Sequence, residues 1–555
     1  MVDLLGIFGF LVVLLRAATL CFQTILAGGL IFLFFVASSN GLRPEELTRP
    51  SWKFIRWSGA GLALCQLAFL IVNALVLGDS SEISIRDLLG ANFAIAGIVA
   101  IVASVGVALW PSRLRKSMNP AVLVLAALIL GSSVVTSHSF SRMEGRAVLV
   151  GLTSLHYLAT ASWIGGLPYL LLSMKRVSEQ GTRIRISQRF SRLAQISVAV
   201  LFLAGLGMSL VFVGSWNALY GTAYGIMVGT KVVLFGCLLL LGAANYFIVR
   251  GIGAASPSGA TSLIRFGEVE IGIGLTVILA AASLTSQPPG ADLTEDRVSL
   301  HEIAVRYAPR MPQLTSPPLG DLSPAGKEQE RQAKLAGVKV PAAFMPGESF
   351  SHPDTPGDIA WSEYNHAWAG LIVFFMGLLA LLSRNRYFSW AKIWPLMFLG
   401  LAVFLFLRAD PENWPLGPNG FWASFREADV LQHRAAVLMI IVFALFQWAV
   451  ETNRVKSHAA ALVFPGVCAI GGIVLLTHMH AVTNIKQEML VELTHTPLAI
   501  FGIVAGWARW LELRLPQENN TRKYLAWVWP VCFVFVGLIL MDYHEAWKRK
   551  VISYQ

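Results

Sequence analysis

Charged residues are scarce in this chain of 555 residues. Asp, Glu, Lys and Arg make up 14% of it, whereas 55% of its residues are hydrophobic. A typical soluble domain carries about 25% charged residues. The mean hydropathy is +0.62. This shortage of charge argues against a soluble protein and predicts a chain that lies largely within a membrane.

The sequence also lacks the motifs of several functional classes. It has no glycine-rich phosphate loop and no nucleotide-binding domain, which argues against an ATP-driven pump on this chain. Its five cysteines form neither a Cys-x-x-Cys pair nor a Cys-x-x-Cys-His haem-attachment motif. We see no soluble catalytic domain and therefore expect the protein not to be an enzyme. Because no basic segment precedes the first apolar run, we expect no cleaved signal peptide.

Apolar runs of about 20 residues, the length that crosses a bilayer as a helix, are abundant instead. They are continuous rather than alternating, which favours helices over the strands of a membrane barrel. We predict an all-α, polytopic membrane protein with about 14 transmembrane helices in two helical bundles. Residues 4–15 are also apolar, so they either lie at the interface or extend the first helix beyond Arg16. The predicted spans are 18–38, 57–78, 90–110, 119–137, 154–174, 195–214, 226–248, 266–285, 366–383, 393–408, 434–450, 459–477, 496–512 and 524–541.

The charge of the loops predicts the orientation, because Lys and Arg are retained on the cytoplasmic side. In the first half, one set of alternate loops holds fifteen basic residues, and the other set holds only Arg86, Arg142 and Arg146. The second half agrees less sharply, because the same count places its basic C-terminal tail on the outer side. The net charge of +11 is then mainly a topology signal, and nucleic-acid binding is not needed to explain it. The lipid bilayer is the expected environment.

The same count predicts the domain organisation. Residues 1–285 form a membrane domain of eight helices, and residues 363–555 form a second membrane domain of six. Between them, the proline-rich residues 286–362 are predicted to be an extended connector on the outer side.

Histidines gather at the predicted outer face, which takes ten of the eleven. A single histidine there is more often an interfacial residue than a metal ligand, because imidazole suits that layer. Several histidines of the second half, however, accompany carboxylates, and imidazole with carboxylate suits Cu(II), Zn or Fe. We predict one metal site there, formed by His366, His433, His478, His480, Glu492 and His495.

In the first half, His138 and His156 stand at facing ends of two neighbouring predicted spans, so a short outer loop can bring them together. We predict that they form a metal entrance. Trp163 follows His156 by seven residues on the same helical face and could line the path below. Met208 and Met227 are candidate thioether ligands further in, which would suit Cu(I). The alternatives are that the methionines fill the core and the histidines anchor helix ends.

Polar residues within the predicted spans are further functional candidates, because such groups are costly in a membrane. Gln23, Asn73 and Asn245 are of this kind. Glu268 and Glu270 lie near the inner end of the eighth predicted span, where Arg265 could neutralise one of them.

Several motifs resemble the bacterial copper resistance protein D family, in an order that is fairly specific and extends over about residues 10–300. They are Ser137-His138, LHYLA at 155–159, WIGGL at 163–167, RFSRLA at 189–194, Tyr224-Gly225 with Lys231, Asn245, and TSQPP at 285–289. The motifs NHAW at 365–368, WPLG at 414–417, QHR at 432–434, THMHA at 477–481 and GWARWLE at 506–512 are similar to the C-terminal extension of longer members.

This resemblance implies copper handling at the bacterial inner membrane, usually as uptake from periplasm to cytoplasm. Copper is then the expected metal, and a periplasmic copper-binding protein is a candidate partner. The outer-face histidines of the family map onto His138 and His156. The first span departs from the family pattern, because Arg16-Ala17-Ala18 lacks the histidine often found near that arginine.

Two other functions fit the same residues. Paired histidines at helix ends could bind haem b or a di-metal centre in a redox protein, and the Glu-x-x-His pairs ending at His366 and His495 are similar to those of di-iron bundles. Alternatively, the protein senses copper or hands it to a partner without transport.

Overall fold

The computed structural model describes the chain except for residues 1, 39–44, 81–84, 118, 252–256, 295–296, 319–355, 411–412, 418, 426–427, 478–484 and 545–555. The chain divides into two compact units. Unit 1 is formed mainly by Met1–Arg297, and unit 2 mainly by the residues from Val298 onward. Within the described ranges every element is a helix apart from one isolated bridge, between Asn413 and Asn419.

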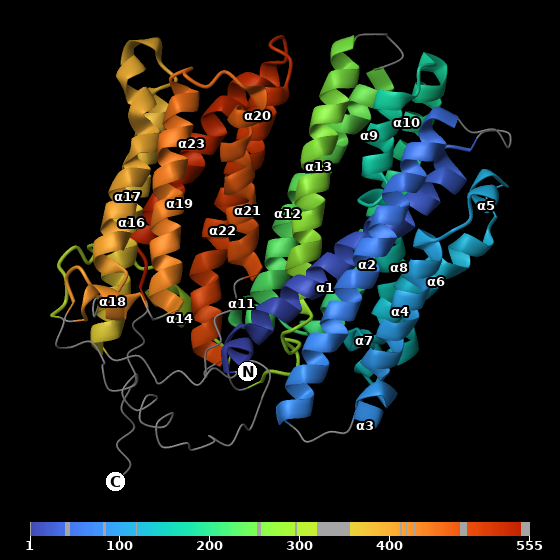
Figure 1. The fold of residues 1–555 in the computed structure, drawn as a ribbon, viewed down its shortest axis with the longest axis horizontal. Helices are drawn as coiled ribbons and strands as arrows, with labels where there is room; N and C mark the ends of the chain where they lie inside the picture. Colours follow the sequence, from blue (N-terminus) through green and yellow to red (C-terminus); the bar gives the residue numbers. More distant parts are fainter. Residues whose placement is uncertain are drawn as a thin grey trace. The chain divides into compact units, whose positions relative to one another are not determined.

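Unit 1 is a bundle of long helices joined by short ones (Figure 1). Its short helices α3, α7 and α11 lie toward the lower end of the bundle in Figure 1, and α9 toward the upper end. Its elements are α1 (Val2–Ile31), the π-helical turn η1 (Phe32–Val36), α2 (Glu45–Ser80), α3 (Ile85–Gly90), α4 (Asn92–Ala108), α5 (Ser112–Ser117), α6 (Ala121–Val135), α7 (His138–Ser141), α8 (Arg146–Trp163), α9 (Leu167–Arg176), α10 (Gln180–Phe212), α11 (Trp216–Gly221), α12 (Ala223–Gly251) and α13 (Pro257–Leu284).

Unit 2 is also helical, and its longest helices pack in the order α16, α23, α22. A short helix, α14, lies within the segment that was predicted to be an extended connector, and Ser299 and Glu302 form a capping box at its start. The elements are α14 (Leu300–Arg306), α16 (Pro356–Leu382), the 3-10 helix η4 (Arg386–Leu396), α17 (Met397–Arg408), α18 (Phe421–Ser424), α19 (Ala428–Glu451), α20 (His458–Ala461), α21 (Val463–Thr477), α22 (Ile485–Arg514) and α23 (Asn520–Met541).

The prediction of an all-helical membrane protein is confirmed, with 10 candidate membrane-spanning helices among the described residues. Each of the predicted spans overlaps a helix, but the count of fourteen stays a prediction. Helices α4 and α6 are apolar yet have only 17 and 15 residues. At a rise of about 1.5 Å per residue they are shorter than a bilayer core of about 30 Å.

Several helices extend beyond the predicted spans, and α1 and α8 are the two that bear on the site. The apolar residues 4–15 continue α1, and the Arg16 guanidinium within it donates to the carbonyl of Thr136 at 3.4 Å. Helix α8 begins at Arg146 rather than near residue 154, because the apolar run of residues 147–152 continues the helix toward its N-terminus. His156 therefore lies ten residues inside α8 and not at its end.

Helix α1 approaches α8 and the turn after it so closely that glycine is required. A Cβ atom on Gly28 would lie 2.3 Å from the carbonyl oxygen of Ala161, and one on Gly165 would lie 2.0 Å from that of Thr24. Small residues allow membrane helices to approach in this way, so that dispersion contacts hold them together. This close approach gives the WIGGL motif a physical role.

We expect Gly165→Ala to destabilise the protein by at least about 1–3 kcal/mol, the usual cost of overpacking, because the added methyl group meets backbone atoms that cannot move aside. Thermal unfolding in detergent measures the effect. Gly151→Ala in the preceding helix α8 is the matched control, because a Cβ there meets nothing within 4 Å. Equal melting temperatures for the two variants would contradict the close-packing argument.

Candidate functional site

His138 begins α7, at the predicted outer end of unit 1, and is half-buried against α10. Its ring centroid lies 6.3 Å from that of Phe212, and one ring nitrogen hydrogen-bonds the backbone of Thr285. Burial, and then the nearby Arg16 guanidinium, lower the pKa of His138 from its ordinary 6.5. Its Nε2 atom is buried without a hydrogen-bond partner among the described residues. The ring is thus neutral at pH 7, which is the form that binds metals.

A chain of polar contacts leads from this end into the bundle. The hydroxyl groups of Ser139 and Thr153 lie 2.6 Å apart, and the Thr153 hydroxyl donates to the sulfur of Met208 at 3.3 Å. Met208 packs against a buried apolar cluster that includes Met227, which is 2% exposed. The two thioethers that the sequence singled out therefore belong to the same cluster.

His156 lies one turn beyond Thr153 on α8 and faces α10 and α12. A Cβ on Gly205 would lie 3.9 Å from the Cε1 atom of His156. The Nδ1 atom of His156 is buried and has no hydrogen-bond partner within the described ranges. Lys231 on α12 interacts electrostatically with this ring. A cation that reaches His156 would meet both a ligand atom and a repelling charge.

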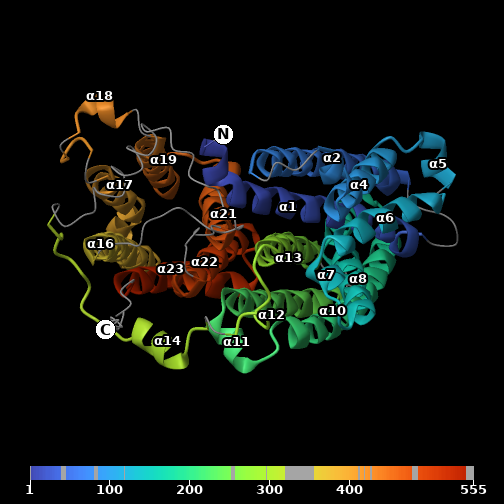
Figure 2. The same cartoon turned by 90° about the horizontal axis from the view of Figure 1, so that it is seen from below.

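The order of these groups follows from their places on neighbouring helices, since α8 packs against α10 and α10 against α12 (Figure 2). Three residues of α10 contact these groups in turn. Phe212 contacts His138, Met208 contacts Thr153, and Gly205 lies beside His156. Seven residues of helix span about 10 Å, which separates the two histidines. The sequence predicted that the methionines lie further in than both histidines. In the structure they lie between the two histidines, because His156 lies deep within α8.

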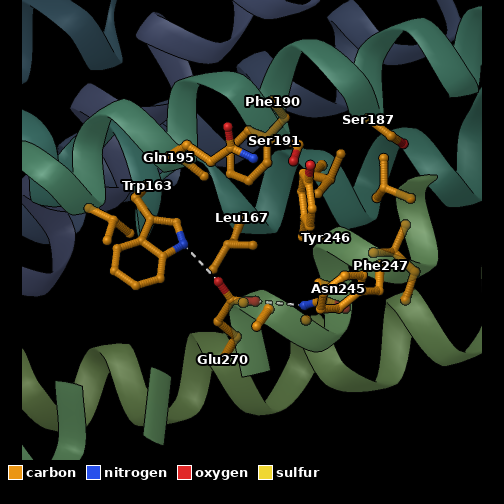
Figure 3. Close-up of a pocket in the computed structure, with 18 of the residues that line it drawn as sticks. Trp163, Leu167, Ser187, Phe190, Ser191, Gln195, Asn245, Tyr246, Phe247 and Glu270 are labelled. Atoms are coloured by element: carbon orange, nitrogen blue, oxygen red, sulfur yellow. Dashed lines mark hydrogen bonds between the residues drawn. The ribbon is translucent and has the colours of Figure 1, made fainter. Parts of the chain in front are cut away.

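Trp163 lies two turns below His156 and is 2% exposed. Its indole N–H donates to Oε1 of Glu270 at 2.7 Å, and the Nδ2 atom of Asn245 donates to Oε2 of the same carboxyl group, also at 2.7 Å. These three side chains come from α8, α12 and α13 and meet at the wall of a cavity of about 360 Å³ (Figure 3). Arg265 pairs with Glu268 at 2.7 Å and not with Glu270.

The sequence marked Trp163, Asn245 and Glu270 separately but did not predict that they meet. Their separations along the chain are 107 and 25 residues. The one signal was that each is a polar group within an apolar span. Gln23 is a similar case, since it accepts a hydrogen bond from Ser133 at 2.6 Å.

In unit 2, two of the predicted metal ligands come together. The ring centroids of His366 on α16 and His495 on α22 lie 6.3 Å apart. The ring of Tyr543 stacks on His366 at 3.9 Å and meets His495 edge-on at 5.8 Å. The Nδ1 atom of His366 also lies 2.8 Å from the carbonyl oxygen of Ser362. Glu492 is three residues before His495 on α22.

The contacts between His366, His495 and Tyr543 do not include His433, the other described histidine predicted for this site. His433 on α19 is half-exposed and lies 2.7 Å from the Oδ1 atom of Asp410. His478 and His480 lie outside the described residues. Within the described part of the chain, no group of three or more His, Cys, Asp or Glu side chains is placed to hold a metal ion. The six-residue site therefore stays a prediction.

A buried ion-pair network in unit 2 was not predicted. Glu512 accepts from Arg384 at 2.6 Å, from Arg509 at 2.8 Å and from the indole of Trp529 at 3.0 Å. Arg509 also pairs with Glu451 at 2.9 Å. Both guanidinium groups lie over the Trp529 ring, at 4.9 and 5.2 Å from its centroid. These contacts join α19, α22, α23 and the turn that follows α16.

Comparison with known proteins gives matches in the first half of the chain. Residues 184–284, which run from α10 to α13, match the family model described as copper resistance protein D. The copper transport protein CutJ of Bacillus subtilis (strain 168) is 28% identical over 169 residues. That alignment covers 30% of this chain and 29% of CutJ, so the chain matches less than a third of the relative's length. No solved structure matches the chain.

The Glu512 network generates a stability prediction. Glu512→Gln should reduce the free energy of unfolding by about 3–5 kcal/mol, because it leaves two buried guanidinium groups without their shared carboxylate. Chemical unfolding in detergent followed by tryptophan fluorescence measures it. Glu518→Gln is the control, since Glu518 is exposed and should change stability by less than about 0.5 kcal/mol. A Glu512→Gln variant as stable as this control would show that the network does not hold the helices together.

Proposed function

We propose that this chain, a member of the copper resistance protein D family, carries copper ions through unit 1 from the periplasm to the cytoplasm across the bacterial inner membrane. Copper is its cargo, and the protein acts as a carrier or channel rather than as an enzyme. The family match and the relative's description as a copper transport protein support the metal. The route is inferred from the side chains of unit 1.

One observation carries the proposal: the thioethers of Met208 on α10 and Met227 on α12 lie between the imidazoles of His138 on α7 and His156 on α8, and both imidazoles keep a buried ring nitrogen without a partner among the described residues. Buried polar atoms normally have a hydrogen-bond partner, so such atoms need an explanation. Imidazole and thioether are the ligands that copper prefers. His138 also has the hydrogen bond to backbone that orients metal-binding histidines.

The position of Lys231 fits passage better than storage. Conduction requires that an ion bind well enough to enter and weakly enough to leave. Met208 and Met227 offer the copper ion a weak binding site between the two histidines. The positive charge of Lys231 then repels a copper ion bound at His156 and favours its release. Capture at His138 and passage at His156 are therefore the roles that we propose.

Unit 2 is proposed to assist at the outer face, where His366 and His495 are the candidate copper ligands. A haem between these two rings is less favoured, because Tyr543 packs against both of them. A periplasmic copper-binding protein as the donor stays a prediction.

Replacing both histidines of unit 1 tests the proposal. In proteoliposomes supplied with Cu(I) under reducing conditions, His138→Ala/His156→Ala should reduce copper uptake at least tenfold, because two ligand stages are lost. His458→Ala is the control, since this histidine is exposed in unit 2 and should leave uptake unchanged. A double variant that folds normally and transports copper at the original rate would end the proposal. If the two histidines only stabilised the packing of the bundle, the melting temperature would fall while uptake per folded molecule stayed the same.

The direction of transport rests on the predicted orientation. In a cysteine-free background, Ser316→Cys should react with an impermeant thiol reagent added to intact spheroplasts, and Ser178→Cys should react only after lysis. Both positions are exposed in the structure, so their accessibility reports the side of the membrane. The reversed pattern would place the His138 end in the cytoplasm and turn the proposed uptake into export.

A further inference from the structure

Glu270 is a carboxyl group within the membrane bundle that the copper pathway does not use. Its side chain lies on α13 and is 2% exposed. It accepts two hydrogen bonds, from Trp163 and from Asn245, and it borders the cavity between α8, α10, α12 and α13 (Figure 3). Ionisable groups at such depth are rare and usually functional, because their charge is costly there.

The charged and titratable groups around Glu270 leave its charge unbalanced. On α13 itself, Arg265 pairs with Glu268. The helices packed against α13 carry titratable groups on α12 (Tyr224, Lys231, Cys237, Tyr246 and Arg250), on α1 (Arg16 and Cys21) and on α9 (Tyr169, Lys175 and Arg176). Helix α10, across the cavity, carries Arg183, Arg185, Arg189 and Arg192. Of all these groups, only Tyr246 lines the cavity with Glu270. No described cation therefore pairs with the Glu270 carboxylate.

A buried, unpaired carboxylate is normally neutralised by a proton or by a bound cation. The described cavity lining has no imidazole and no sulfur, and the oxygens beside the carboxyl group are hard donors. Hard oxygen donors suit Mg²⁺, Ca²⁺ and Mn²⁺ rather than Cu(I). Such ions need about six ligands, more than Glu270 and Asn245 supply. A proton fits this site better than a metal ion.

Asn245 can satisfy the carboxyl group in both protonation states. When Glu270 is ionised, Asn245 donates through Nδ2, as in the structure. When Glu270 carries a proton, its O–H needs an acceptor, and the buried Oδ1 atom of Asn245 has no partner among the described residues. Rotation of the amide exchanges donor for acceptor, since the two ends differ only in hydrogen-bonding sense. The pair can therefore keep its mutual hydrogen bond whether or not the carboxyl group carries a proton.

The site lies where the proposed copper route meets the cavity. Trp163 is two turns below His156, and its indole closes the end of the cavity at which Glu270 lies. From there the cavity follows α10 back to Ser187, near the predicted inner end of that helix. A proton on Glu270 can thus exchange with water on the inner side, and its presence alters the acceptor that holds Trp163.

We propose that Glu270 is the proton-coupling residue of the transporter and that one proton enters with copper. This inference rests on the proposed function. An O–H bond forms on a Glu270 carboxylate oxygen when the proton arrives from the outer side. The bond breaks when the proton passes to water in the inner cavity, and no electrons are transferred. The proton gradient across the membrane then drives the uptake of copper.

Copper and proton movement are measured together in proteoliposomes that contain a trapped pH indicator and a Cu(I) chelator. For the wild-type protein, copper uptake should acidify the interior, and an acidic exterior should accelerate uptake several-fold. Glu270→Gln keeps the size and hydrogen-bonding capacity of the side chain but cannot titrate. It should abolish copper-driven acidification and make uptake insensitive to the gradient. Glu268→Gln, two residues away on the same helix, is the matched control and should behave as wild type.

The outcomes separate the two proposals. Copper uptake without acidification in the wild type, or acidification that survives in Glu270→Gln, overturns the proton-coupling inference and leaves the proposed function standing. Absence of copper uptake by the wild type under every gradient overturns both.

Infrared difference spectroscopy tests the protonation itself without transport. A carbonyl band of a buried protonated carboxylic acid should appear as pH is lowered, vanish in Glu270→Gln and persist in Glu268→Gln. If Glu270→Gln fails to fold, Trp163→Phe serves instead, because it removes one hydrogen-bond donor and should move the pH midpoint of the band. The absence of a pH-dependent band from the wild type, or a midpoint unchanged in Trp163→Phe, would rule out Glu270 as the proton site.

Discussion

A polar side chain inside a lipid bilayer must find its partner within the protein, and this constraint organises both units. Because the bilayer core contains no water, burying a polar group there without a hydrogen-bond partner costs several kcal/mol. The bundle of unit 1 meets the constraint through contacts between distant helices, such as Gln23 with Ser133 and Arg16 with Thr136. Unit 2 meets it through the carboxylates and guanidinium groups around Trp529. The buried groups left without a partner then stand out as candidates for function.

Three of the unpartnered buried atoms in unit 1 lie along the proposed route or beside Glu270. The Nε2 atom of His138 and the Nδ1 atom of His156 lie on the proposed outer half of the route, and the Oδ1 atom of Asn245 lies beside Glu270. Soft or borderline donors thus occupy the outer half, and hard oxygens occupy the region below Trp163. Copper and protons differ in the donors that they prefer, so the two halves suit different ions.

Helical class and the positions of most spans could be predicted from the sequence, because a run of apolar residues is a local property. The depth of His156 could not. The predicted span began near residue 154, whereas the apolar residues 147–152 before it also belong to α8. The meeting of Trp163, Asn245 and Glu270 was equally out of reach, since it depends on how α8, α12 and α13 rotate against one another. The prediction that the metal is copper came from the resemblance to a family, whereas the contacts of each side chain came from the structure.

The tight contact between α1 and α8 links the packing of unit 1 to its proposed mechanism. Gly165 follows Trp163 by two residues, and its contact with the backbone of α1 fixes the turn that ends α8. With the backbone held there, the indole ring is the part free to respond when its acceptor changes. The Trp163 ring also contacts the Phe235 ring of α12 edge-on, with 6.2 Å between the centroids. A shift of the indole would therefore displace Phe235, which lies one turn from Lys231 on α12. Protonation at Glu270 and the barrier to copper at His156 can therefore be coupled through one side chain, with no large movement of the helices.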